Sequence, residues 1–81
     1  MTGSANAERD YKSAIAAHQK VIATWPNDPK AADAMLSIAS SQEAMGDKAA
    51  AQKTLQNVMA KYPGTQAAAN AKLRLAQATK R

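Results

Sequence analysis

The chain lacks the residue types that would mark it as a disulfide-stabilised, thiolate metal-binding or β-sheet protein. It contains no cysteine, which excludes disulfides and thiolate metal sites. It contains no phenylalanine, and one tryptophan and two tyrosines are its only aromatic residues. No segment alternates β-branched with polar residues, so strands are not expected.

Long apolar stretches are also missing. No segment is long enough to cross a bilayer, and the first residues do not contain the apolar region of a signal peptide. We therefore expect no membrane insertion. Residues 1–4 resemble a cloning remnant, which leaves residues 5–81 as one small domain.

Acidic residues are few, with six against eleven lysines and arginines, and the formal net charge is +5. Such a charge is compatible with binding to nucleic acid. However, the basic residues are scattered, and no aromatic residues stand among them to stack on bases. The pattern favours a solvated helical surface over a nucleic-acid partner, and a salt-dependent gel shift would be the observation that reverses this expectation.

Reactive side chains are equally sparse. An enzyme needs several titratable groups that converge, and this chain offers one histidine, two glutamates and four aspartates. His18 falls on a predicted inner helix face, where a packed, hydrogen-bonded histidine is expected; a pH-sensitive or ligand-binding role is the alternative. No second histidine or cysteine exists to complete a metal site. The sequence predicts neither an enzyme nor a bound cofactor.

Alanine is abundant, at about a quarter of all residues, and it is the best helix former. The pair Trp25-Pro26 recurs as Tyr62-Pro63, 37 positions later, and the residues around it recur as well. The matched pairs are Ala14 with Ala51, Val21 with Val58, Ile22 with Met59, Ala32 with Ala69, Ala34 with Ala71, Leu36 with Leu73 and Ile38 with Leu75. A fixed period in this range is typical of a helical solenoid.

Turn and capping residues divide this solenoid into four helices. The bends are expected at residues 26–29, 46–47 and 63–65. The helices are expected from about Ala7 to Trp25, from Pro29 to about Met45, from about Lys48 to Lys61, and onward from Thr65 to about Ala78. Asp28, Asp47 and Thr65 are suitable N-caps, and Gly46 is suitable for a positive φ at a helix end. The expected fold class is all-α, built of successive antiparallel hairpins.

Apolar residues three and four positions apart define the inner face of each helix. In chain order these faces comprise Tyr11, Ala14, Ile15, His18, Val21, Ile22 and Trp25; Met35, Ile38, Ala39, Gln42 and Met45; Ala51, Leu55, Val58, Met59 and Tyr62; and Ala68, Ala71, Leu75 and Ala76. Three methionines are expected to fill the core, although methionine is also common on adaptable binding surfaces. Trp25 and Tyr62 are expected to pack over the junction to the following helix.

Residues 32–65 resemble a tetratricopeptide repeat. The resemblance is carried by small and apolar residues at fixed places and by a closing proline, namely Ala39, Gly46, Ala51, Leu55 and Pro63. Met35 and Gln42 depart from it, because they stand where the family usually has tryptophan and tyrosine. The resemblance implies a right-handed solenoid fragment of about four antiparallel helices, with one full repeat flanked by half repeats, that serves as a protein–protein interaction scaffold.

A narrower resemblance covers nearly the whole chain after residue 4. It is carried by residues 10–11, 14–17, 29–36, 46–51, 54–55, 61–65 and 71–75. These segments resemble the C-terminal repeats of the Tol-Pal system cell-division coordinator family, and related outer-membrane assembly lipoproteins have similar Tyr-Pro repeat ends. The coordinator family implies a periplasmic location, the TolA protein as partner, and a link between the Tol-Pal system and cell-wall synthesis.

In tetratricopeptide repeats the first helix of each unit lines a concave groove, and in this chain those helices are the second and the fourth. The groove residues expected by this resemblance are Asp33, Ser37, Ser40, Glu43, Asn70, Arg74 and Gln77. They are small or polar, so a peptide backbone can approach them. An ordinary solvated helix surface is the alternative.

The first helix resembles the second helix of a repeat that lacks its own first helix. Its apolar residues Tyr11, Ile15 and Ile22 are therefore expected to lack cover on one flank, and exposed apolar area of this kind tends to be buried by a partner. The alternative function is a self-associating module, either a homodimer or a helix-swapped dimer. If Glu8, Arg9 and Lys12 shield the flank, the chain is instead monomeric.

Overall fold

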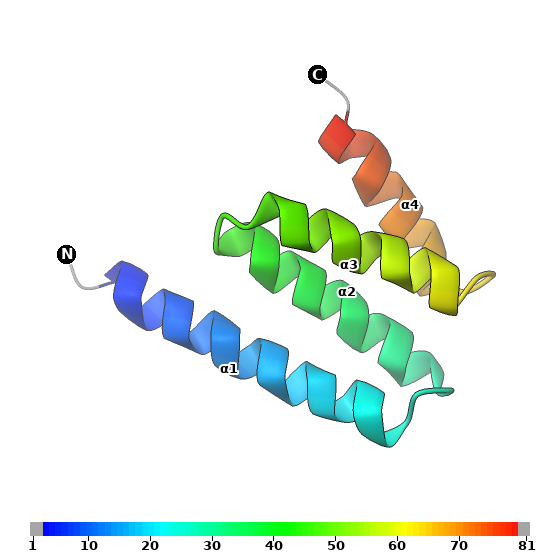
Figure 1. Ribbon diagram of the computed structural model, residues 1–81, viewed down its shortest axis with the longest axis horizontal. Helices are drawn as coiled ribbons and strands as arrows, with labels where there is room; N and C mark the ends of the chain where they lie inside the picture. Colours follow the sequence, from blue (N-terminus) through cyan, green and yellow to red (C-terminus); the bar gives the residue numbers. More distant parts are fainter. Residues whose placement is uncertain (1–2, 80–81) are drawn as a thin grey trace.

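The computed structural model describes residues 3–79 as four α-helices joined by short loops (Figure 1), with side-chain surroundings given for residues 10–77. The helices are α1 (Gly3–Thr24), α2 (Pro29–Ala44), α3 (Lys48–Lys61) and α4 (Gln66–Thr79). The described residues include no strand, so the all-α prediction is confirmed. The first helix begins at Gly3 and not near Ala7, because the alanines at its start favour extension of the helix.

The predicted N-caps are confirmed at three helices. The first N–H groups of a helix have no partner within the helix, and a short polar side chain ahead of the helix accepts a hydrogen bond from one of them. The bonds observed run from Lys30 N to Asp28 Oδ1 at 2.9 Å, from Ala50 N to Asp47 Oδ1 at 3.3 Å, and from Ala68 N to Thr65 Oγ1 at 3.1 Å.

The loop between α2 and α3 is a tight reversal built on one glycine. Gly46 has a φ of +88°, in the left-handed region that favours glycine. Its N–H donates to the carbonyl of Glu43 at 2.9 Å, and the N–H of Asp47 donates to the carbonyl of Gln42 at 2.8 Å. These two bonds form a Schellman motif, in which the last carbonyls of α2 are satisfied as the chain turns back.

α2 is the central helix of the molecule. It contacts α1 on one side and α3 on the other, and it also contacts α4. α1, α2 and α3 lie side by side, whereas α4 is inclined steeply to them (Figure 1). Within the described part of the chain, α1 contacts no helix except α2.

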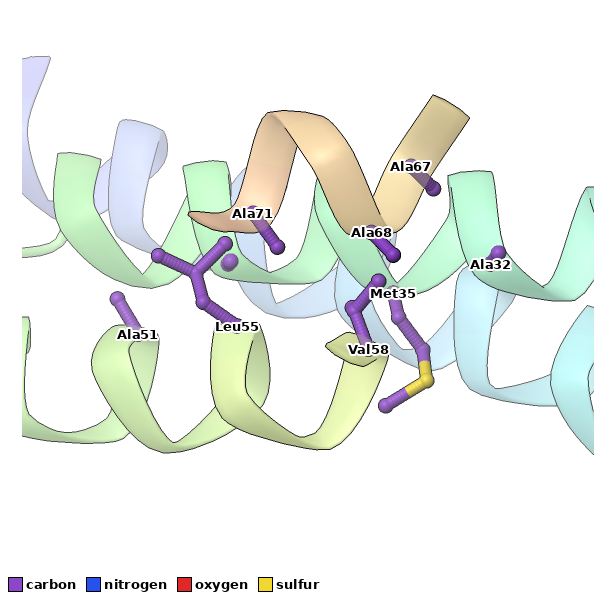
Figure 2. Packing of buried hydrophobic residues seen from close by; sticks show 9 residues of the cluster. Ala32, Met35, Ala51, Leu55, Val58, Ala67, Ala68 and Ala71 are labelled. Carbon is purple, nitrogen blue, oxygen red and sulfur yellow. The ribbon is translucent and has the colours of Figure 1, made fainter. Parts of the chain in front are cut away.

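The core is built mostly of alanine. Its largest fully buried side chains, Leu55 and Val58, project from α3 toward α2 and α4 (Figure 2). Around them lie small residues of the neighbouring helices, including Ala39, Ala68 and Ala71. Because alanine side chains end at Cβ, the helix axes can approach closely, and a thin molecule of 43 × 37 × 15 Å results.

A second buried flank of α2 faces α1. Ala31, Ala34 and Ile38 are buried but do not belong to the core cluster around Leu55. They lie three and four positions apart, on one side of the helix, and α1 is the remaining helix that contacts α2. The predicted inner face of α1 is partly buried from Tyr11 to Ile22, so α1 covers this flank with that face.

Two predicted inner residues are exposed. Trp25 is 53% exposed, so its place on the inner face of α1 is not confirmed; it lines a shallow hollow with Pro26, Asn27 and Asp28 of the α1–α2 junction. It follows the last residue of α1, where Pro26 prevents the helix from continuing. Ala76 is also exposed, because the inclined α4 leaves the core beyond its first turns, and Ala67 is buried near the start of the helix instead.

Candidate functional site

Two adjoining hollows lie along the side of the molecule where α2 and α4 meet. The first, of about 350 Å³, is lined by Leu36, Ser37, Ser40, Asn70, Leu73, Arg74 and Gln77. The second, of about 480 Å³, is lined by Glu43, Lys48, Gln52, Arg74 and Gln77. We call them the leucine hollow and the lysine hollow, and together the groove. They share Arg74 and Gln77, so side chains of one bound segment can occupy both.

Arg74 connects α4 to α2 across the groove. Its Nη1 donates a hydrogen bond to Ser40 Oγ at 2.6 Å, and both side chains are partly buried. The other N–H groups of the guanidinium remain available, because arginine carries five donors. No carboxylate of the described residues forms an ion pair with it. The groove therefore holds a fixed positive charge that a serine hydroxyl positions.

A polar contact between α2 and α3 sets the place of the lysine hollow. The hydroxyl of Thr54 lies 2.7 Å from Gln42 Oε1 and 2.9 Å from the carbonyl of Ala50, and it donates its proton to one of these acceptors at a time. This contact holds the first half of α3 against α2. Lys48 and Gln52 belong to that half of α3, and both line the lysine hollow.

The leucine hollow adds an apolar surface to the groove. Leu36 and Leu73 are repeat-equivalent residues, and both line the same hollow. Leu73 is 60% exposed, and Leu36 is partly buried against the core. An exposed leucine beside serine and asparagine can pack against an apolar side chain while the polar groups bond a peptide backbone. A hollow of about 350 Å³ lies at the low end of the size range of ligand-binding clefts.

The groove does not contain the groups that covalent catalysis needs. A serine nucleophile requires an adjacent base, and the hydroxyl of Ser40 instead accepts a bond from Arg74. His18 lies on α1, which does not contact α4. The hydroxyls, amides, cations and leucines that line the groove are suited to binding.

The structure brings together most of the residues predicted to line the groove. Six of the seven line the hollows, namely Ser37, Ser40, Glu43, Asn70, Arg74 and Gln77. Asp33 is exposed on α2 and lines neither hollow. Whether a partner occupies the groove is a separate question, and the binding role of these residues stays a prediction.

Sequence reasoning missed Leu36, Leu73, Lys48 and Gln52. Leu36 and Leu73 form a repeat-equivalent pair that lies outside the predicted inner faces. A leucine that recurs in the repeat but does not face the core was the signal that could have indicated a binding surface. Lys48 gives a second signal as the first residue of α3, because a helix N-terminus disfavours a cation. No signal in the sequence distinguishes Gln52 from the other glutamines of the chain.

The residues predicted for self-association lie apart from the groove. Tyr11, Ile15 and Ile22 are partly buried on α1, and Ile22 packs against the core cluster. Glu8 and Arg9, expected to shield them, lie outside the residues whose side chains are described. His18 is partly buried as expected, but its imidazole forms no hydrogen bond to any residue described here, so its predicted bonding is not supported.

Two further properties of residues 3–79 bear on the kind of site. No three histidine, aspartate or glutamate side chains described here lie close enough together to hold a metal ion. None of the described helices combines the length and the apolar character that a membrane span requires.

Comparison with known proteins places a known repeat over the centre of this fold. Residues 33–65 match the tetratricopeptide repeat family, and this match covers α2 beyond its first turn, α3 and the loop before α4. It supports a tetratricopeptide-repeat region there, close to the predicted 32–65. No curated protein and no solved structure matches the chain. Tetratricopeptide repeats generally mediate protein–protein interactions and are typically not enzymes.

Proposed function

We propose that this tetratricopeptide-repeat region is a protein-interaction scaffold whose groove binds an extended segment of a partner protein. The observation that carries the proposal is the leucine hollow, which α2 and α4 build together from repeat-equivalent leucines and from small polar residues. The side chains of Ser37 and Ser40 are short, so a peptide backbone can approach α2 closely.

The proposed interaction is weak. The groove extends over two adjoining hollows only, and interfaces at the low end of the size range belong to transient encounters. We expect dissociation constants above about 1 μM for a short segment.

Peptide selection followed by mapping tests this function. A library of random peptides displayed on phage is selected against the chain, and bound peptides are then titrated while backbone amide shifts are recorded by NMR. The expected result is that shifts change at Ser37, Ser40, Asn70 and Gln77 and stay unchanged along α1. Selection of no binder, or shift changes confined to α1 or to the outer face of α3, would exclude the groove as the binding site.

We also propose a more specific role, as the repeat module of a periplasmic Tol-Pal cell-division coordinator that docks the TolA protein. The support is the resemblance of residues 29–36, 46–51 and 61–65 to the C-terminal repeats of that family. Calorimetric titration with the periplasmic part of TolA tests it. Binding that is lost in Ser40→Arg and kept in Lys53→Gln is expected, since Lys53 is exposed and lines neither hollow. No heat of binding at concentrations near 1 mM would exclude this partner.

The alternative function, self-association, has one observation in its favour. α1 contacts only α2 within the described chain, and its inner face is partly rather than fully buried from Tyr11 to Ile22. A second copy would complete the burial of that face. This alternative does not use the groove, so the two functions can be tested independently.

A further inference from the structure

Charge is divided unequally between the two halves of the chain. Residues 48–81 contain seven lysines and arginines and no aspartate or glutamate, whereas residues 1–47 contain four basic and six acidic residues. The net charge of +5 therefore arises entirely from the half that forms α3 and α4. A charge difference of this kind between halves of a chain indicates an anionic partner for the basic half.

The groove lies where the two halves meet, and two of the basic residues line it. Lys48 and Arg74 both line the lysine hollow, and Glu43 is the only acidic residue named around either hollow in the described part of the chain. Glu43 forms no ion pair with either of them among the described residues. Two cations and one carboxylate give the lining of the lysine hollow a net positive charge, and neither cation is held in an ion pair with Glu43.

Local stability does not explain Lys48. It is the first residue of α3, and the partial positive charge of a helix N-terminus disfavours a cation there by about 0.3–1 kcal/mol in exposed positions. Asp47, directly before it, offsets part of this by capping the helix. A residue that is unfavourable for the helix but faces a hollow suggests a role in binding.

We propose that the groove recognises a partner segment in which an acidic side chain stands close to an apolar one. The carboxylate lies between Lys48 and Arg74 in the lysine hollow, and the apolar side chain packs on Leu36 and Leu73 in the leucine hollow. Because the hollows share Arg74 and Gln77, neighbouring residues of one extended segment reach both. This inference rests on the proposed function and specifies the chemistry of its ligand.

An acidic peptide fits the groove better than a nucleic acid does. The groove includes the exposed Leu73, whose apolar side chain can neither neutralise a phosphate group nor form a hydrogen bond with it. Lys53 and Lys61 are exposed on α3 but line neither hollow, so the basic residues do not extend the groove into a continuous cationic stripe. Proteins that track nucleic acid combine such a stripe with aromatic residues for stacking.

Three matched synthetic peptides test the proposal. Each contains one central leucine, flanked by glutamates, by glutamines or by lysines, and is otherwise composed of glycine and serine. Fluorescence anisotropy is recorded with labelled peptide and increasing protein. We expect the glutamate peptide to bind about five- to tenfold more tightly than the glutamine peptide, and the lysine peptide to bind most weakly. The preference should shrink as salt rises from about 0.01 M to about 1 M, where the Debye length falls from about 30 Å to about 3 Å.

Charge variants locate the preference within the structure. Lys48→Gln and Arg74→Gln should each remove most of the preference for glutamate, whereas Lys53→Gln and Lys61→Gln, which change the net charge equally, should keep it. Lys48→Glu should bind the lysine peptide more tightly than the unaltered chain does. Circular dichroism checks that each variant is folded. Because Lys48 is exposed, its variants should fold normally and still test the proposal if Arg74→Gln is unstable.

The outcomes separate this inference from the proposed function. Equal binding of the glutamate and glutamine peptides, with loss of both in Leu73→Asp, would overturn the acidic preference and leave the groove as a binding site. If Lys53→Gln and Lys48→Gln weaken the preference for the glutamate peptide equally, that preference depends on net charge alone, and the assigned contact with Lys48 is overturned. Binding of a duplex DNA as tightly as the glutamate peptide would assign the basic half to nucleic acid instead. Binding of none of the peptides, together with no binder from the library, would exclude both proposals.

Discussion

The hydroxyl of Tyr62 donates a hydrogen bond of 2.6 Å to the backbone carbonyl of Pro26, 36 residues earlier in the chain. Tyr62 stands at the end of α3, and Pro26 lies in the loop between α1 and α2. The bond therefore ties two successive aromatic-proline corners of the repeat together. The ring of Tyr62 is partly buried and packs against the core cluster, so one side chain both fills space and fixes the loop.

The first prediction concerns this contact. Tyr62→Phe removes only the hydroxyl and should lower the free energy of unfolding by about 0.5–1 kcal/mol. The melting temperature should then fall by several degrees, at about 4–8 °C per kcal/mol for a domain of this size. Tyr62→Ala also removes the ring and should cost about 2–3 kcal/mol, at or below the range for a fully buried aromatic.

Tyr11→Phe is the matched control. Tyr11 is partly buried on α1, and its hydroxyl forms no hydrogen bond to the described residues, so its removal should leave the melting temperature unchanged. If Tyr62→Phe melts with the unaltered chain, the bond to Pro26 contributes nothing to stability.

The second prediction compares two leucines. Leu55 is fully buried and Leu73 is 60% exposed. Leu55→Ala should therefore lower the free energy of unfolding by about 2–5 kcal/mol, because it leaves a cavity in the core. Leu73→Ala should change it by less than about 0.5 kcal/mol. Urea denaturation measures both, and similar losses for the two variants would contradict the assignment of Leu73 to a binding surface.

The third prediction concerns the glycines of two loops. Gly46 and Gly64 have φ values of +88° and +81°, and a Cβ added at either would meet no atom within 4 Å. The penalty for Gly46→Ala and Gly64→Ala is therefore conformational and not steric, and should be about 1–2 kcal/mol each. Asparagine, which adopts this conformation more readily, should cost less at both positions. If the alanine variants have higher melting temperatures than the asparagine variants, the loops adopt another conformation.

The fourth prediction concerns association through α1. We expect a concentration-dependent homodimer in sedimentation equilibrium between micromolar and millimolar protein, formed through the face that carries Tyr11, Ile15 and Ile22. Ile15→Asp should shift it to monomer, because a carboxylate in an apolar contact is strongly unfavourable. Ala16→Asp adds the same charge on the exposed side of α1 and should leave the dimer intact.

A constant monomer mass over this range would rule the homodimer out. Ile15 also lies on the face of α1 that packs on α2, so Ile15→Asp can unfold the chain as well as disrupt a dimer. Circular dichroism of this variant distinguishes the two effects. The groove on α2 and α4 is not involved, so peptide binding should be equal in both variants.

Local signals made the helix boundaries predictable. Asp28, Asp47 and Thr65 each cap the helix that follows them, and such caps depend on short-range chemistry that the sequence displays directly. The repeat period then gave the order of antiparallel helices, because each unit packs on its neighbours in the same way.

Contacts between repeats were less predictable. Trp25 and Tyr62 occupy equivalent positions, yet one is exposed and the other partly buried. Tyr62 bonds to a loop 36 residues earlier, and Trp25 has no counterpart of that loop among the described residues. Equivalence in sequence therefore did not give equivalence in environment at these corners.

The groove was only partly predictable for a related reason. Polar residues on the first helix of each unit identified Ser40 and Arg74, whereas Leu36 and Leu73 were recognised only as a repeat-equivalent pair, outside both the predicted inner faces and the predicted groove. The inclination of α4 against α2 decides which side of each helix opens toward the groove, and that inclination depends on close packing around Ala71 rather than on any local signal.

The single interface of α1 has a consequence for how the molecule opens. Detaching α1 breaks its contact with α2 alone, whereas removing α2 breaks the contacts with α1, α3 and α4 at once. Backbone amides of α1 should therefore exchange their hydrogens through a local opening of low free energy, while those of α2 exchange only when the whole molecule unfolds. We therefore expect α2, α3 and α4 to unfold as one cooperative unit, and α1 to detach from it while the groove stays intact.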